Sequence, residues 1–228
     1  MTGSPAALIV GAGQGLSAAL ARRLAARDYR LILAARDPSD LADLAAETGA
    51  TTIACDAGDR TDTARLFAEV DAVGLPLELA IYNPSARVRG PIETLDAEAA
   101  EKAMMVTSYG AFLMAHFAAQ RMVPRGKGNI FFTGASAGVK GFANSTVFAM
   151  GKFGLRGLAQ ALARELQPKG IHVAHFVIDG GIAKADTPNE DESRLDPGAI
   201  ADSYLALLDQ PRSAWTWEIE LRPWTEPF

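Results

Sequence analysis

The sequence predicts an α/β fold in which helices cover both faces of a parallel sheet of about seven strands. Short apolar runs of roughly five residues alternate along the chain with longer amphipathic segments of helical period. The runs are apolar throughout, which is typical of strands buried on both faces. A glycine-rich turn joins the first run to the first helical segment. The 228 residues suffice for one such domain, a doubly wound, Rossmann-like three-layer sandwich over residues 1–228.

The expected elements follow this pattern in order. Strands are expected at residues 7–10, 31–35, 51–55, 77–82, 129–133, 172–178 and 215–221. Helices are expected at 16–27, 40–47, 61–73, 147–166 and 197–208, with a long helical stretch at 96–122 that is either continuous or interrupted near residues 107–110. Residues 180–196 are rich in Asp, Glu, Pro and Gly, so we expect an irregular, mobile insertion that shapes a substrate pocket.

The composition excludes several classes of protein. A net charge of −5 argues against a nucleic-acid or anionic-membrane surface, and the single cysteine, Cys55, excludes an intramolecular disulfide. No apolar run reaches the roughly 18–20 residues of a membrane span, and the first residues do not resemble a signal peptide, so a cytoplasmic protein is expected. His172, His175 and Asp179 lack a fourth ligand, so no metal site is predicted.

The glycine-rich turn indicates a nucleotide. Gly11, Gly13 and Gly15 follow the first strand and precede the first helix. Small residues let the backbone approach a pyrophosphate, and the helix N-terminus offers N–H groups and the positive end of a dipole. Alone, such a string can be an ordinary tight turn; at the first strand–helix junction of an α/β pattern it favours a dinucleotide.

The end of the second strand bears on which dinucleotide is bound. An acidic residue there would bind the ribose hydroxyls of NAD, but Ala35 and then Arg36 occupy the place. A guanidinium suits a 2′-phosphate, so NADP(H) is favoured over NAD(H). The neighbouring Asp37 weakens this preference, and a solvated surface arginine is the alternative.

With these features the chain resembles the short-chain dehydrogenase/reductase family over essentially its whole length. The family's glycine motif is similar to Gly11-Ala-Gly-Gln-Gly15-Leu-Ser17. The resemblance implies that Asp56 caps the adenine and that Asn83, retained from the family's Asn-Asn-Ala-Gly motif, steadies the sheet beside the cofactor. It also implies that Lys152 holds the nicotinamide ribose. The residues expected to bind NADP(H) are Gly11, Gly13, Gln14, Gly15, Leu16, Arg36, Asp56, Ala57, Asn83, Pro84, Lys152 and Ile182.

The resemblance does not extend to the rest of the family's catalytic set, which is Asn, Ser, Tyr and Lys. Phe148 stands four residues before Lys152, at the tyrosine position, and a benzyl ring cannot donate a proton. Ala135 stands at the serine position and Thr107 at the asparagine position. A shift of the alignment by one residue would place Ser136 at the serine position instead.

Two functions therefore stay open. One is an NADP(H)-dependent oxidoreductase that acts on a small-molecule carbonyl or alcohol, with Lys152 of lowered pKa or Ser136 as the replacement proton donor. The other is an NADP(H)-binding protein with little or no redox activity, such as a sensor or a non-redox catalyst. The resemblance also implies a homodimer or homotetramer, formed through the helices that contain residues 111–122 and 148–166.

Aromatic and imidazole groups elsewhere are expected to be structural. His175 lies inside a predicted strand, where a core histidine is the more common finding. Trp215, Trp217 and Trp224 cluster near the C-terminus and are expected to form the edge of the core or a self-association surface.

Overall fold

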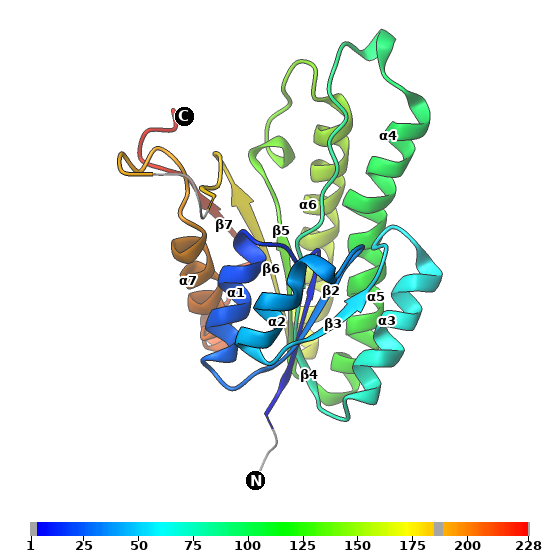
Figure 1. Cartoon of the computed structure of the whole chain (residues 1–228), viewed down its shortest axis with the longest axis vertical. Helices are drawn as coiled ribbons and strands as arrows, with labels where there is room; N and C mark the ends of the chain where they lie inside the picture. The colour runs from blue at the N-terminus through cyan, green and yellow to red at the C-terminus, as the bar shows by residue number, and fades with distance from the viewer. Residues whose placement is uncertain (1–3, 185–188, 228) are drawn as a thin grey trace.

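One parallel sheet of seven strands forms the centre of the molecule in a computed structural model that describes residues 4–184 and 189–227 (Figure 1). The strands are β1 (Ala6–Val10), β2 (Arg30–Ala35), β3 (Thr51–Ala54), β4 (Leu77–Tyr82), β5 (Gly128–Thr133), β6 (Ile171–Ile178) and β7 (Glu218–Leu221). Their order in the sheet is β3-β2-β1-β4-β5-β6-β7. The predicted fold class is therefore confirmed.

Helices cover both faces of this sheet (Figure 1). On one side lie α1 (Leu16–Ala25), α2 (Ala42–Thr48) and α7 (Pro197–Leu208). On the other lie α3 (Arg60–Ala72), α4 (Ala97–Met104), α5 (Gly110–Met122) and α6 (Thr146–Leu166). Within the described residues, no helix has both the length and the apolar character needed to cross a membrane.

The two layers of helices bury two separate apolar cores, and successive residues of each strand serve them alternately. In β1, Ala6, Leu8 and Val10 join the core under α3, α5 and α6. Ala7 and Ile9 join the core under α1, α2 and α7. This arrangement explains why the strand sequences are apolar throughout.

Several element boundaries differ from the sequence prediction. The last strand begins at Glu218 rather than at residue 215. Trp215 lies before the strand and stacks on His172 with ring centroids 4.8 Å apart. The second helix is preceded by a 3₁₀ turn at Ser39–Leu41. The first helix ends at Ala25, and the third strand ends at Ala54, one or two residues earlier than expected.

The long helical stretch is continuous, but its middle is a π-helical turn at Met105–Tyr109. The sequence had left open an interruption near residues 107–110, and this wider turn lies there. Its residues bond outward: the Tyr82 hydroxyl donates to the Val106 carbonyl, and Ser108 Oγ donates to the carbonyl of Gly151 at 2.9 Å. The turn thereby joins α4 and α5 to both β4 and α6.

Candidate active site

The strand order reverses between β1 and β4, and a long cleft opens where the carboxyl ends of these strands diverge. Three adjoining cavities of about 740, 520 and 670 Å³ make up this cleft, and Asn83 lines all three. Gly11 is shared by the two smaller cavities, and Ile182 joins the 520 Å³ cavity to the 740 Å³ cavity.

The cleft brings together nearly all the predicted site residues. Gly11, Gly13, Gln14, Gly15, Leu16, Asn83 and Ile182 line the 520 Å³ cavity; Arg36, Asp56, Ala57 and Pro84 line the 670 Å³ cavity; Ala135, Ser136, Phe148 and Lys152 line the 740 Å³ cavity. Below, these are called the turn cavity, the adenosine-side cavity and the catalytic cavity.

The glycine turn contains one position that only glycine can occupy and two positions with free space around them. Gly11 has φ +79°, and a Cβ there would lie 2.6 Å from Cγ of Pro84. A side chain is therefore excluded by both backbone conformation and space. At Gly13 and Gly15 no atom lies within 4 Å of a Cβ position. The space beside these two glycines opens into the cleft, which suits the close approach of a ligand phosphate to the backbone.

Ser17 and Asn83 hold this turn in place. Ser17 Oγ donates to the Gly11 carbonyl at 3.0 Å, and Asn83 Nδ2 donates to Ser17 Oγ at 2.7 Å. The Asn83 backbone N–H donates to the Val10 carbonyl at 3.0 Å. Asn83 thus ties the end of β4 to the turn. Ser17 is a site residue to which the sequence analysis gave no role beyond its place in the glycine motif.

At the adenosine side, the Asp37 carboxylate next to Arg36 is hydrogen-bonded within its own turn. The Asp37 carboxylate accepts hydrogen bonds from the Ser39 hydroxyl at 2.7 Å and the Ser39 N–H at 2.9 Å, which together lower its pKa. Arg36 is exposed, and no acid among the described residues pairs with it. Asp56 Oδ1 accepts from the Gly58 N–H at 2.9 Å, so this carboxylate caps its own turn at the cavity wall.

Lys152 lies at the other end of the cleft with its side chain almost wholly buried. Only 2% of the residue is exposed, and Nζ donates to the Thr133 carbonyl at 2.8 Å. Burial, followed by the positive charge of Arg87, lowers the pKa of this amine to about 7. The ammonium is therefore placed to exchange a proton near neutral pH.

The groups around Lys152 provide few other proton donors. The Phe148 ring lies with its centroid 6.0 Å from Lys152 Nζ, and Ala135 has no polar side-chain atom. Ser136 and Ser145 bring hydroxyl groups to the catalytic cavity. Ser145 was not predicted; its position directly before the α6 helix, three residues before Phe148, is the signal that could have found it.

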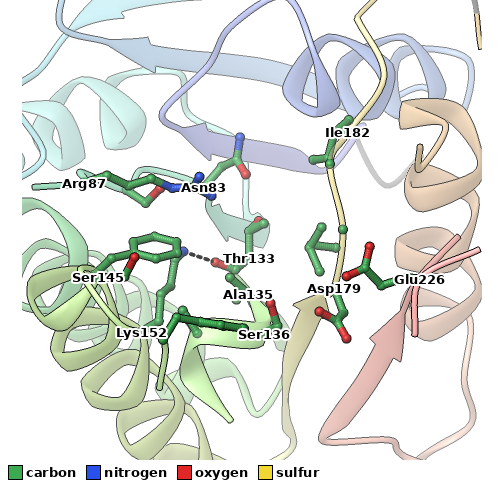
Figure 2. A pocket seen from close by; sticks show the side chains of 18 of the residues that line it. Asn83, Arg87, Thr133, Ala135, Ser136, Ser145, Lys152, Asp179, Ile182 and Glu226 are labelled. Carbon is green, nitrogen blue, oxygen red and sulfur yellow. Dashed lines mark hydrogen bonds between the residues drawn. The ribbon is translucent and has the colours of Figure 1, made fainter. Parts of the chain in front are cut away.

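Figure 2 shows the catalytic cavity with Asn83, Arg87 and Lys152 on one side and Asp179, Ile182 and Glu226 on the other. Arg87, Arg89 and Glu226 were also missed by sequence reasoning. The two arginines follow Asn83 closely in a segment without acids, and that local charge could have drawn attention to them.

Thr107 does not contribute to the wall of any of the three cavities. It is buried in the π turn, where Oγ1 accepts from the Ala86 N–H at 3.0 Å and the side chain packs on Gly151. Its assignment to the family's asparagine position stays a prediction. The hydroxyl instead holds the chain that leads from Asn83 to Arg87.

Under the catalytic cavity lies a partly buried polar group centred on Glu218. Its carboxylate accepts hydrogen bonds from Arg156 Nε and Nη2, each at 2.7 Å, and lies 3.0 Å from His175 Nδ1. Burial lowers the pKa of His175 to about 4, so the imidazole is neutral. The ring packs directly against Gly134, where a Cβ would overlap it. His175 is a core residue, as the sequence predicted, and supports the backbone beside Ala135.

The segment 180–196 borders the cleft in part. Gly180, Gly181 and Ile182 line the catalytic cavity, and Ile182 forms a bridge to Leu195. Residues 185–188 of the predicted insertion lie outside the described residues.

Comparisons with known proteins agree with this geometry. A model described as short chain dehydrogenase matches residues 5–195. The chain is 28% identical over 197 residues to a 3-oxoacyl-acyl-carrier-protein reductase of Mycobacterium avium, covering 86% of this chain and 74% of that protein. It is 24% identical over 223 residues to an uncharacterized oxidoreductase of Staphylococcus aureus strain N315, covering 95% and 96%.

Solved structures are also similar over nearly the whole chain. A short-chain dehydrogenase from Rhodopseudomonas palustris is 35% identical with a TM-score of 0.85, covering 96% of this chain and 99% of that one. A metagenomic short-chain oxidoreductase in complex with NADP has a TM-score of 0.85 at 24% identity, covering 98% and 99%. An alcohol dehydrogenase from Thermococcus sibiricus complexed with 5-hydroxy-NADP has a TM-score of 0.87 at 20% identity, covering 98% of each.

Proposed function

The chain belongs to the short-chain dehydrogenase family, and from that premise we propose that it is an NADP(H)-dependent oxidoreductase with an atypical active site. Its substrate is a small-molecule carbonyl or alcohol. The observation that carries the proposal is one cleft that runs from the braced glycine turn to the buried amine of Lys152.

NADP(H) is preferred in this proposal because Arg36 can offer a guanidinium fork to a 2′-phosphate, while Asp37 is engaged by Ser39. Ala35 offers the ribose hydroxyls of NAD no hydrogen-bond acceptor from its side chain. The NADP ligands named for two structural neighbours support this choice. The turn cavity would hold the pyrophosphate against Gly13 and Gly15, and Asp56 and Ala57 would border the adenine.

When bound, the cofactor supplies or accepts the hydride, and the chain must manage the proton on the substrate oxygen. With Phe148 and Ala135 at the positions of the family's tyrosine and serine, neither position offers a donor. Lys152 is the group that can hold and release the proton, because burial brings its pKa to about 7. Ser136 and Ser145 add hydroxyls that can hydrogen-bond the oxygen.

A second candidate is a protein that binds NADP(H) without redox turnover. The specific observation in its favour is Phe148, which is 8% exposed and covered by the Arg87 guanidinium at 4.3 Å from the ring centroid. An apolar, covered ring at this place is also compatible with a cleft that only binds.

Cofactor titration followed by a turnover assay tests both candidates. We expect NADPH to bind more tightly than NADH, and Arg36→Ala to weaken NADPH about 10- to 100-fold while NADH changes little. Arg30→Ala, at the opposite end of β2, is the matched control. NADPH binding with oxidation by a panel of aldehydes, diketones and quinones supports the oxidoreductase; binding without oxidation supports the second candidate. Equal affinities for NADPH and NADH would refute the cofactor assignment.

Assembly, location and the substrate loop complete the proposal. Phe112 on α5 and Phe153 on α6 are each about half exposed, which fits a homodimer or homotetramer formed through these helices. Residues 180–196 act as the substrate loop of a single domain spanning 1–228. The cytoplasmic location remains a prediction.

A further inference from the structure

We propose that the catalytic cavity selects substrates that carry a carboxylate, which Arg87 binds with help from Arg89. The proposal rests on the proposed function in one respect: it takes this cavity to be the substrate site. It adds the chemical class of the substrate, which the family assignment leaves open.

Arg87 lines the cavity, although the residue as a whole is exposed to solvent. The residue lies in the segment that follows β4, and its guanidinium carbon is 4.3 Å from the centroid of the Phe148 ring. Lys152 Nζ lies 6.0 Å from the same centroid. Arg87 and the amine of Lys152 therefore lie around one ring at the wall where a substrate would meet Lys152, and Figure 2 shows both side chains on the same side of the cavity.

Neither arginine has a counter-ion of its own. Across residues 4–184 and 189–227, no acid forms an ion pair with Arg87 or Arg89, although both line the cavity. Partial burial, followed by the positive charge of Arg89, lowers the pKa of Arg87, so the two arginines repel each other at this wall. An anion at this wall would relieve that repulsion.

The acids of the cavity are placed elsewhere. Asp179 is paired with Lys140 at 3.6 Å and with Arg222 at 3.0 Å. Glu226 lies across the cavity from Arg87 (Figure 2). The cavity is thus positive at the Lys152 wall, and its negative groups are either paired or on the opposite side.

A carboxylate on an apolar body fits the remaining lining. The planar guanidinium matches a carboxylate with two parallel hydrogen bonds. Phe142, Phe148, Ile178 and Ile182 provide apolar contacts for the rest of the molecule, and the volume of about 740 Å³ accommodates it. A 2-oxo acid with an aryl group combines these features with a reducible carbonyl.

Equilibrium binding of phenylglyoxylate and of its uncharged methyl ester tests the proposal without turnover. Calorimetry would be done on the protein alone and on the protein saturated with NADPH. We expect the carboxylate to bind at least about tenfold more tightly than the ester. Arg87→Gln should remove that difference, Arg87→Lys should retain part of it, and Arg30→Gln should leave it unchanged.

Several results would overturn the proposal. Equal affinity of acid and ester for the wild type, or a difference that Arg87→Gln leaves intact, would show that Arg87 only covers the Phe148 ring. A loss of NADPH affinity in Arg87→Gln with unchanged discrimination would assign the arginine to the cofactor. Thermal unfolding of each variant checks the fold, and weaker acid binding at high salt in the wild type is expected independently of any substitution. Failure of the oxidoreductase proposal would instead appear as absent turnover with the acid still bound.

Discussion

The two ends of the cleft are built from different parts of the chain. At the glycine turn, backbone groups and missing side chains make the site: Gly11 is confined by its φ of +79° and by Pro84, and Gly13 and Gly15 leave open space. At the catalytic end, individual side chains make the site, and Lys152, Phe148 and Arg87 define what it can do. In the proposed function, the first end follows the family's glycine motif, while Phe148 and Ala135 take the places of the family's tyrosine and serine at the second.

In the proposed function, cofactor binding and proton transfer therefore depend on separate parts of one cleft. At the glycine turn, a side chain at Gly11 would overlap Pro84, so this position cannot change without a shift of the backbone. A wall defined by side chains can lose its proton donors while the strands and helices that carry it stay in place.

The largest expected effect comes from restoring proton donors at the catalytic end. Phe148→Tyr adds a hydroxyl at the cavity edge, and Ala135→Ser adds a second donor. We expect the double variant to reduce carbonyl compounds with NADPH about 10²–10⁴-fold faster than the wild type, because a positioned proton transfer is worth that much. The rate increase of the double variant should exceed the sum of the rate increases of the two single variants, because both donors act on one oxygen. Initial rates of NADPH oxidation provide the measurement.

The single variants are the controls, and NADPH affinity should not change in any of them. Wild-type turnover at roughly 1–10³ s⁻¹, the range of ordinary enzymes, would show that another donor is already sufficient. No gain in any variant on any substrate would favour the binding protein.

A smaller effect is expected at the glycine end. Gly11→Ala should lower the free energy of unfolding by about 1–2 kcal/mol for the left-handed backbone and by about 1–3 kcal/mol more for the overlap with Pro84. Gly74→Ala is the matched control, because Gly74 has φ +73° but no atom within 4 Å of a Cβ position. Urea unfolding of both variants separates the cost of the left-handed backbone from the cost of the overlap with Pro84. Equal losses would mean that Pro84 yields and that the turn is less confined than the geometry indicates.

The smallest effect concerns the pH dependence of stability at Lys152. The unfolded chain keeps this proton up to its ordinary pKa of 10.5, whereas the folded protein releases it near pH 7. The unfolded state therefore binds more protons above pH 7, and stability should rise with pH by at most about 1.4 kcal/mol per unit. Lys152→Met should lack this rise.

Urea unfolding of the cofactor-free protein between pH 7 and 9 measures the difference between the two proteins. The upper limit avoids Cys55, whose pKa burial raises from 9.0 to about 11. The exposed Lys102→Met should follow the wild type. Parallel curves for wild type and Lys152→Met would mean that the folded protein keeps Lys152 protonated with an ordinary pKa, and Lys152 would then not exchange its proton near neutral pH.

The sequence predicted the elements that follow a short repeat of apolar residues, and the turn that has a fixed local geometry. Apolar runs indicated the seven strands, and the glycine spacing indicated the turn that lies at the head of the cleft. The helix spacing placed Phe148 and Lys152 on one face, and the measured distance agrees.

The remaining features depend on how segments distant in the chain meet. Arg87 reaches the Phe148 ring only because the segment after β4 folds back over α6, and no local pattern encodes that path. Thr107 was assigned to the site by its sequence position, but the π turn directs its hydroxyl to the Ala86 N–H. Ser17 became a support of the glycine turn through Asn83, which is 66 residues away.

The π turn at Met105–Tyr109 also requires a fixed number of residues, whatever their side chains are. It holds one residue more than an α-helical turn would, so α4 and α5 differ in helical phase by about 100° from an uninterrupted helix. We expect that deleting Thr107 or Ser108 would restore regular winding but rotate α4 away from α6. The Val106 carbonyl would then be drawn back into the helix and withdrawn from Tyr82. At this place the protein can exchange side chains more easily than it can lose a single peptide unit.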